Sequence, residues 1–272
     1  ITVLPLNSAT LSTPPGTDNQ TVCINTPLAA IEYITTGATG ASFSGLPGGV
    51  TGSWVSDKVT ISGIPTVSGT FSYTITLTGG CGVITAGGTI NVTPDNTITL
   101  SSAPGTDNQT VCEGSPLTDI TYATTGATGA DFTGLPAGVS GAWAADVVTI
   151  SGILSTSGTF NYTITLTGGC GTVTETGTIT VSPILPVSVT VAADANPVCA
   201  GTTVNFTATP VNGGTAPVYQ WQVNGVDTGT GNSGFSYIPI NGDTVTVILL
   251  SNEMCTSGNP DTSAIVEMTV HD

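Results

Sequence analysis

The stretch SGTFSYTITLTGGCG occupies residues 68–82, and it recurs almost letter for letter at residues 157–171. Its large apolar side chains, Phe71, Tyr73, Ile75 and Leu77, alternate with threonine and serine. Successive side chains of a β-strand point to opposite faces, so this period of two gives one apolar face and one hydroxyl-bearing face. We therefore expect the central strand of an antiparallel sandwich, followed by a glycine turn that contains Cys81.

The chain of 272 residues repeats itself with a shift of 89 residues. The shift maps three landmark residues of the first unit onto the second, Cys23 to Cys112, Trp54 to Trp143 and Cys81 to Cys170. It also places residues 1–3 on the last strand of the first unit. We therefore expect three tandem domains at residues 4–93, 94–182 and 183–272, preceded at residues 1–3 by the final strand of another repeat. We therefore expect the chain to be an excerpt from a longer array, or to have lost one end.

Short alternating segments bounded by glycine and proline predict an all-β fold without helices. Besides the quoted stretch, the first unit shows strands at residues 9–13, 20–24, 31–36, 58–62 and 83–92, and a short one at Trp54. The third unit shows them at residues 203–209, 218–223, 235–240, 244–250 and 264–270, with a hairpin at Asn224-Gly225. Each unit should be an Ig-like β-sandwich, and short proline-bearing connectors predict an elongated, semi-rigid array.

The six cysteines lie at positions that repeat with the unit, separated by 58, 58 and 56 residues. This repetition predicts one disulfide within each domain, with the pairs Cys23–Cys81, Cys112–Cys170 and Cys199–Cys255. The short Cys-x-x-Cys pairs typical of metal sites do not occur in the sequence. Disulfides predict an extracellular or periplasmic location.

Composition excludes several classes of function. Seventeen acidic residues face a single Lys or Arg, and the formal net charge is −16. Nucleic acid and anionic lipid both require basic side chains, so neither is an expected partner. No apolar run reaches the length of a membrane span, so direct membrane insertion is not expected.

Several motifs resemble a known family. The segments GLPGGV (45–50), VTISGIP (59–65) and SGTF (68–71) resemble the Ig-like repeats of bacterial surface proteins. With GTDNQTVC (16–23) and TGGCG (78–82), they resemble most the repeats of giant adhesins of Bacteroidetes, such as the SprB type used in gliding motility. The third unit, with NPVCAG (196–201) and YQW (219–221), is similar to their PKD-like Ig domains. The resemblance implies type IX secretion and a place at the bacterial cell surface.

Few residues are candidates for a binding site. Trp54 and Trp143 could stack on a sugar ring, although a lone strand tryptophan usually fills its own core, as we expect for Trp221. Asp18 and Asp107 lie near the expected unit junctions and are weak calcium candidates, but Asx residues after Pro-Gly also make ordinary turns. Otherwise no cofactor or metal is expected.

Residues suited to catalysis are scarce. The only histidine is the penultimate residue, and no two acidic residues are placed in the sequence in a way that predicts a pair of catalytic carboxylates in a cleft. We do not expect an enzyme. The first hypothesis is a structural stalk segment of a long surface adhesin or filament, mediating attachment or gliding, whose partners are neighbouring repeats of the same chain. The alternatives are a carbohydrate-binding module and a calcium-dependent homotypic adhesion array. Surface glycans and other surface proteins are further candidate partners.

Overall fold

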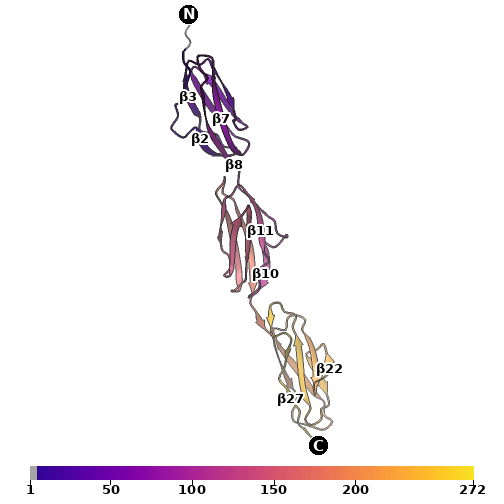
Figure 1. Ribbon diagram of the computed structural model, residues 1–272. Coiled ribbons are helices and arrows are strands. Elements are labelled where there is room, and N and C mark those ends of the chain that lie inside the picture. The colour runs from indigo at the N-terminus through magenta and orange to yellow at the C-terminus, as the bar shows by residue number, and fades with distance from the viewer. Residues whose placement is uncertain (1–4) are drawn as a thin grey trace.

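The computed structural model describes residues 5–272, apart from the side chain of residue 230. Three β-sandwiches follow one another end to end, with the first and the last at opposite extremities (Figure 1). Each has its own buried core, and we refer to unit 1 (residues 5–93), unit 2 (94–182) and unit 3 (183–272). The all-β, elongated architecture is therefore confirmed. The strand expected at residues 1–3 lies outside the described residues.

Unit 1 contains two four-stranded sheets around one core. Its strands are β1 (Ser8–Leu11), β2 (Asn19–Cys23), β3 (Ile31–Thr36), β4 (Gly40–Ser44), β5 (Val50–Val55), β6 (Lys58–Gly63), β7 (Gly69–Thr78) and β8 (Thr85–Thr93). One sheet has the order β1-β3-β6-β5 and the other β2-β8-β7-β4. Neighbouring strands are antiparallel except β2, which runs parallel to β8.

The strand predicted from the repeated stretch is β7, which lies between β8 and β4 in its sheet. Tyr73, Ile75 and Leu77 are 2%, 0% and 4% exposed, and Phe71 packs against the same core. Burying each of these large apolar side chains contributes about 2 kcal/mol, so the alternating pattern largely decides which face of the strand turns inward.

Unit 2 repeats unit 1 strand for strand. Its strands are β9 (Thr97–Leu100), β10 (Asn108–Cys112), β11 (Ile120–Thr125), β12 (Gly129–Thr133), β13 (Val139–Ala144), β14 (Val147–Gly152), β15 (Gly158–Thr167) and β16 (Thr174–Ser182). The sheets have the orders β13-β14-β11-β9 and β10-β16-β15-β12. Inside the core the hydroxyls of Tyr122 and Tyr162 lie 2.9 Å apart and join the two sheets. Burial raises the pKa of both tyrosines, so this hydrogen bond is between neutral groups.

Unit 3 keeps the sandwich but changes its details. Its strands are β17 (Leu185–Pro186), β18 (Ser188–Ala193), β19 (Val198–Cys199), β20 (Val204–Val211), β21 (Val218–Val223), β22 (Val226–Thr230), β23 (Gly234–Tyr237), β24 (Thr244–Leu250), β25 (Thr256–Ser257), β26 (Asp261–Thr262), β27 (Val266–Glu267) and β28 (Val270–His271). The main sheets have the orders β18-β20-β23 and β22-β21-β24-β26, and β27 also pairs with β24. The short pairs β17–β25 and β19–β28 are parallel.

The core of unit 3 is aromatic, with Trp221 only 1% exposed and stacked on Phe235 at 5.5 Å between ring centroids. This confirms Trp221 as a core residue. The predicted hairpin is also present, because Asn224 and Gly225 join β21 to β22 with φ values of 51° and 74°. Two positive φ values in a two-residue turn match the right-handed twist of the flanking strands.

Several strands, including β4 and β18, are not predicted by the sequence pattern, and one predicted strand is broken. The sequence pattern does not indicate β4, because Phe43 is its one large apolar side chain and no alternation is visible. A Cβ at Gly52 of the other sheet would collide with the Phe43 ring, so the glycine makes room for it. The strand expected at residues 264–270 is broken into β27 and β28. Just before it, the Ser263 hydroxyl accepts the Val247 N–H at 3.1 Å, which interrupts the regular backbone ladder.

Candidate functional site: the bridged junctions

Each unit has a cysteine at the end where the chain enters it. We call Cys81, Cys170 and Cys255 the entry cysteines. In unit 1, the Asn7 backbone N–H donates to the Cys81 carbonyl at 2.9 Å. The Asn7 side-chain amide donates to the carbonyls of Gly79 and Gly82, both at 2.8 Å, and the residue is 2% exposed. A buried asparagine therefore holds the cysteine loop from inside.

The other units hold their entry cysteines similarly. The Asn96 N–H donates to the Cys170 carbonyl at 2.7 Å, and its side-chain amide donates to the carbonyls of Gly168 and Gly171 at 2.8 and 2.9 Å. In unit 3, the Leu185 N–H donates to the Cys255 carbonyl at 2.8 Å. The position of the entry cysteine is thus fixed within each unit.

A second cysteine lies at the opposite end of each unit, where the chain leaves it. We call Cys23, Cys112 and Cys199 the exit cysteines. They are the last residues of β2, β10 and β19, and each pairs in parallel with the strand that leaves the unit. Their register partners are Thr93, Ser182 and His271 respectively.

The disulfides join neighbouring units. Cys23 bonds to Cys170 with the Cα atoms 5.7 Å apart, and Cys112 bonds to Cys255 with the Cα atoms 5.3 Å apart. Cys81 and Cys199 are unpaired and exposed. The predicted disulfide within each domain is therefore wrong for all three pairs, Cys23–Cys81, Cys112–Cys170 and Cys199–Cys255.

The length of the sandwich explains the correction. Cys23 is level with Thr93 at the end of β8, whereas Cys81 precedes the start of that strand. β8 has nine residues, which at about 3.3 Å per residue span roughly 30 Å. A disulfide needs Cα atoms within about 7 Å, so these two cysteines cannot meet without unfolding the sheet. Each cysteine instead lies at one end of its unit, where an exit cysteine faces the following unit and an entry cysteine faces the preceding one.

The linkers beside the disulfides are very short. The Thr93 carbonyl still accepts from Ile24 in unit 1, and the Asn96 N–H already donates within unit 2, so only residues 94–95 lie between. At the second junction, the Ser182 carbonyl accepts from Glu113 and the Leu185 N–H donates within unit 3. Each junction thus has a two-residue, proline-containing linker and a disulfide, two covalent connections in all.

Apolar side chains near the junctions remain in contact with solvent. Val67 at the exit end of unit 1 is 52% exposed, Ile184 in the second linker is 41% exposed, and Met254 beside Cys255 is 67% exposed. Obligate interfaces bury such side chains. The relative orientation of two units therefore depends mainly on the linker and the disulfide.

Solved structures share this arrangement of three domains. The chain is similar to the I-band fragment I67–I69 from titin, with a TM-score of 0.57 at 9% identity over 97% of this chain and 99% of that chain. For the three-Ig structure of an E-to-A variant of titin domains I67–I69, the TM-score is 0.53 at 9% identity over 93% and 95%. The chain is a tandem array of Ig-like domains. At this identity the likeness concerns the fold alone, and no protein-family model or curated protein sequence matches the chain.

The two candidate sugar-stacking residues, Trp54 and Trp143, are partly buried against the cores of their units. Their indole N–H groups donate to the hydroxyls of Thr35 and Thr124, both at 2.9 Å. One edge of each ring is thereby fixed by the domain itself, which favours a structural role. Glycan stacking stays a prediction, and loss of glycan-array binding in Trp54→Ala/Trp143→Ala would support it.

The weak calcium candidates, Asp18 and Asp107, do not lie at the junctions. The Asp18 carbonyl accepts from the Thr89 N–H at 3.0 Å and the Tyr73 hydroxyl at 3.3 Å, which places it near the middle of the second sheet. Asp107 has the same place in unit 2, where its carbonyl accepts from Thr178. Among the residues that the structure describes, no three His, Cys, Asp or Glu side chains are grouped so that they could hold a metal ion. Calcium binding stays a prediction.

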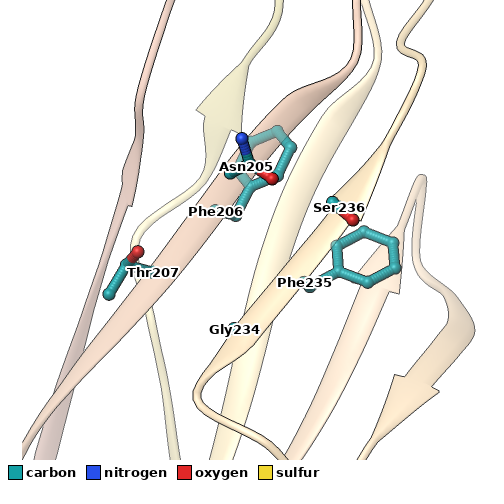
Figure 2. Close-up of a pocket in the computed structure, with 6 residues that line it drawn as sticks. All are labelled: Asn205, Phe206, Thr207, Gly234, Phe235 and Ser236. Atoms are coloured by element: carbon teal, nitrogen blue, oxygen red, sulfur yellow. The ribbon is translucent and has the colours of Figure 1, made fainter.

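A shallow depression of about 250 Å³ lies on unit 3 (Figure 2). Its lining comes from the two paired strands β20 and β23, namely Asn205, Phe206, Thr207, Gly234, Phe235 and Ser236. None of these side chains titrates near neutral pH. The neighbouring Asp194 accepts from the Asn205 side chain at 2.7 Å and from its backbone N–H at 2.9 Å, and these bonds lower the pKa of the carboxyl. We find no general acid or base at this depression.

Residues 5–272 contain no helix with the length and hydropathy of a membrane span. The candidate functional residues of the array are the six cysteines, of which four form disulfides between units and two are unpaired and exposed.

Proposed function

We propose that this segment is a non-catalytic stalk element of a long cell-surface adhesin or filament, which holds an adhesive region away from the surface. The observation that carries the proposal is the pair of covalent connections at each junction. A two-residue linker alone permits bending, because the exposed apolar side chains show that little interface restrains it. The disulfide adds a second tie beside the linker and so restricts both bending and twisting between units.

The cellular setting belongs to the same proposal. Stable disulfides require an oxidising compartment, which supports a location outside the cytoplasm. The resemblance to giant adhesins of Bacteroidetes supports a bacterial cell surface, type IX secretion and a part in attachment or gliding. We also propose residues 4–93, 94–182 and 183–272 as the domain boundaries, with further repeats of a longer chain as neighbours.

The stalk role predicts that the junction disulfides keep the rod straight. One variant replaces the four bridging cysteines by serine (Cys23→Ser/Cys170→Ser/Cys112→Ser/Cys255→Ser). Small-angle scattering of this variant should show a smaller radius of gyration and a broader distribution of dimensions than in the unaltered protein. The matched control is Cys81→Ser/Cys199→Ser, which removes only unpaired thiols and should scatter like the unaltered protein. Identical curves for all three proteins would contradict a stiffening role.

A further inference from the structure

Two cysteines have no partner, and they lie at opposite ends of the array. Cys81 is the entry cysteine of unit 1, and Cys199 is the exit cysteine of unit 3. Both are exposed, whereas the bonded entry cysteine Cys170 is only 3% exposed. An exposed thiol alone says nothing about a partner, so the surroundings of the two residues decide the question.

The backbone around Cys81 already has the geometry of a bonded entry cysteine. Asn7 holds its loop with three hydrogen bonds of 2.8–2.9 Å, and Asn96 holds the Cys170 loop with three of 2.7–2.9 Å. The isolated bridge between Leu6 and Cys81 likewise matches the one between Asp95 and Cys170. The entry end of unit 1 therefore presents the same half-junction that unit 2 presents to unit 1.

The backbone around Cys199 correspondingly matches a bonded exit cysteine. Cys199 is the register partner of His271, as Cys23 is of Thr93. The residue after each cysteine repeats the match, since the Ala200 N–H donates to the His271 carbonyl at 2.8 Å and the Ile24 N–H donates to the Thr93 carbonyl at 2.9 Å. The exit end of unit 3 therefore presents the other half-junction.

We propose that Cys81 and Cys199 are the two halves of a further junction disulfide, so that the entry end of this segment accepts the exit end of another unit of the same kind. The proposal rests on the stalk function above and names the partner of that stalk at each end. Both observed bridges join an exit cysteine to an entry cysteine. The contact is thus head-to-tail, and a contact of this type extends as a filament.

The bond forms by thiol–disulfide exchange with an external disulfide such as oxidised glutathione. The Cys199 thiolate attacks that disulfide and releases one glutathione thiolate, which leaves a mixed disulfide on Cys199. The Cys81 thiolate of the adjoining unit then attacks the Cys199 sulfur and releases the second glutathione. Two protein thiols are oxidised and one glutathione disulfide is reduced, so the electrons balance.

A second copy of this chain is the available probe, because its ends carry both halves. The net charge of −16 makes two copies repel each other, so the reaction is run at about 0.5 M salt, where the screening length is only a few Å. Cys81→Ser retains only the exit thiol, and Cys199→Ser retains only the entry thiol. Each single variant leaves the two observed bridges untouched.

The two variants are incubated in a glutathione redox buffer, separately and as an equimolar mixture, and dimers are followed on non-reducing gels. The mixture should form dimers at least tenfold faster than either variant alone, and mass spectrometry should find Cys81 bonded to Cys199. Equal rates in all three reactions would mean random thiol oxidation and would overturn the proposal. No dimer in the mixture would overturn it too. The scattering comparison of the bridged junctions is independent of either result, so the stalk function can fail or stand separately.

Discussion

The loops at residues 78–82 and 167–171 have the same sequence, TGGCG, and differ only in what lies next to them. Asn7 and Asn96 hold the two loops with equivalent hydrogen bonds. Cys81 is nevertheless exposed, whereas Cys170 is 3% exposed, bonded to Cys23, and 3.1 Å from the Thr93 hydroxyl. Each unit therefore forms the loop by itself, whereas the cysteine that completes the disulfide comes from its neighbour. The disulfide is an element of the junction, and each sandwich folds its core without one inside it.

The largest expected effect is on the length that the chain reaches under force. With both bridges intact, the shortest covalent path runs to Cys23, crosses to Cys170, returns to Cys112 and crosses to Cys255. Only about 100 of the 272 residues then lie on the path, which limits the unfolded chain to about 350 Å, against about 950 Å after reduction. Single-molecule force spectroscopy with and without reductant should show this roughly threefold difference.

The control for the force experiment is Cys81→Ser/Cys199→Ser, which should behave like the unaltered protein in both conditions. Bridges confined to single units would instead leave every linker on the path. Equal final extension before and after reduction would contradict the crossed arrangement.

The next largest effect is on the free energy of unfolding. The Cys23–Cys170 bridge closes a loop with a sequence separation of 147, so removing it should lower the stability of units 1 and 2 together by up to about 5 kcal/mol on the chain-entropy model. The double variant Cys23→Ser/Cys170→Ser avoids leaving a thiol that could mispair. Denaturant unfolding followed by tryptophan fluorescence measures the loss. Cys81→Ser should change the free energy of unfolding by less than about 0.5 kcal/mol, as exposed surface substitutions do. An equal loss in Cys81→Ser and in the double variant would show that the bridge adds no stability of its own.

A smaller effect is expected on the local opening of the two loops that Asn7 and Asn96 hold. Asn7→Ala and Asn96→Ala each leave two loop carbonyls without their donor, which costs about 1–3 kcal/mol. In the oxidised protein the disulfide still restrains the second loop, so hydrogen exchange should rise at residues 79–82 more than at residues 168–171. Reduction should remove the difference between the variants. Equal exchange in the oxidised variants would show that the bridge does not restrain its loop.

The sequence predicts most of each sandwich because the information lies within the unit. The alternation at residues 71–77 is sufficient to identify β7 and its buried face, and Asn224-Gly225 is sufficient to identify a hairpin. Strand β4 cannot be predicted from hydrophobic periodicity, because a single phenylalanine among small residues shows no period. Its partner is a distant glycine, Gly52, whose role appears only once the two sheets pack.

The cysteine pairing could not be read from the repeat itself. An equal separation within each unit is compatible with a bond inside the unit and equally with a bond to the next one, because both recur with the same shift. The direction of the β7 strand excludes a disulfide within the unit. The β7 strand carries the chain from the exit end to the entry end, so Cys81 lies far from Cys23. Assigning the order and direction of the strands first would place Cys23 and Cys81 at opposite ends of unit 1, which excludes a disulfide between them.

The most direct test of the account is the disulfide map of the native protein. Free thiols are first alkylated without reductant, and the chain is then digested with an acid-residue-specific protease, because the single Lys or Arg leaves trypsin almost nothing to cut. We expect label on Cys81 and Cys199 only, and cross-linked peptides that contain Cys23 with Cys170 and Cys112 with Cys255. A peptide that joins Cys23 to Cys81, or Cys112 to Cys170, would contradict it.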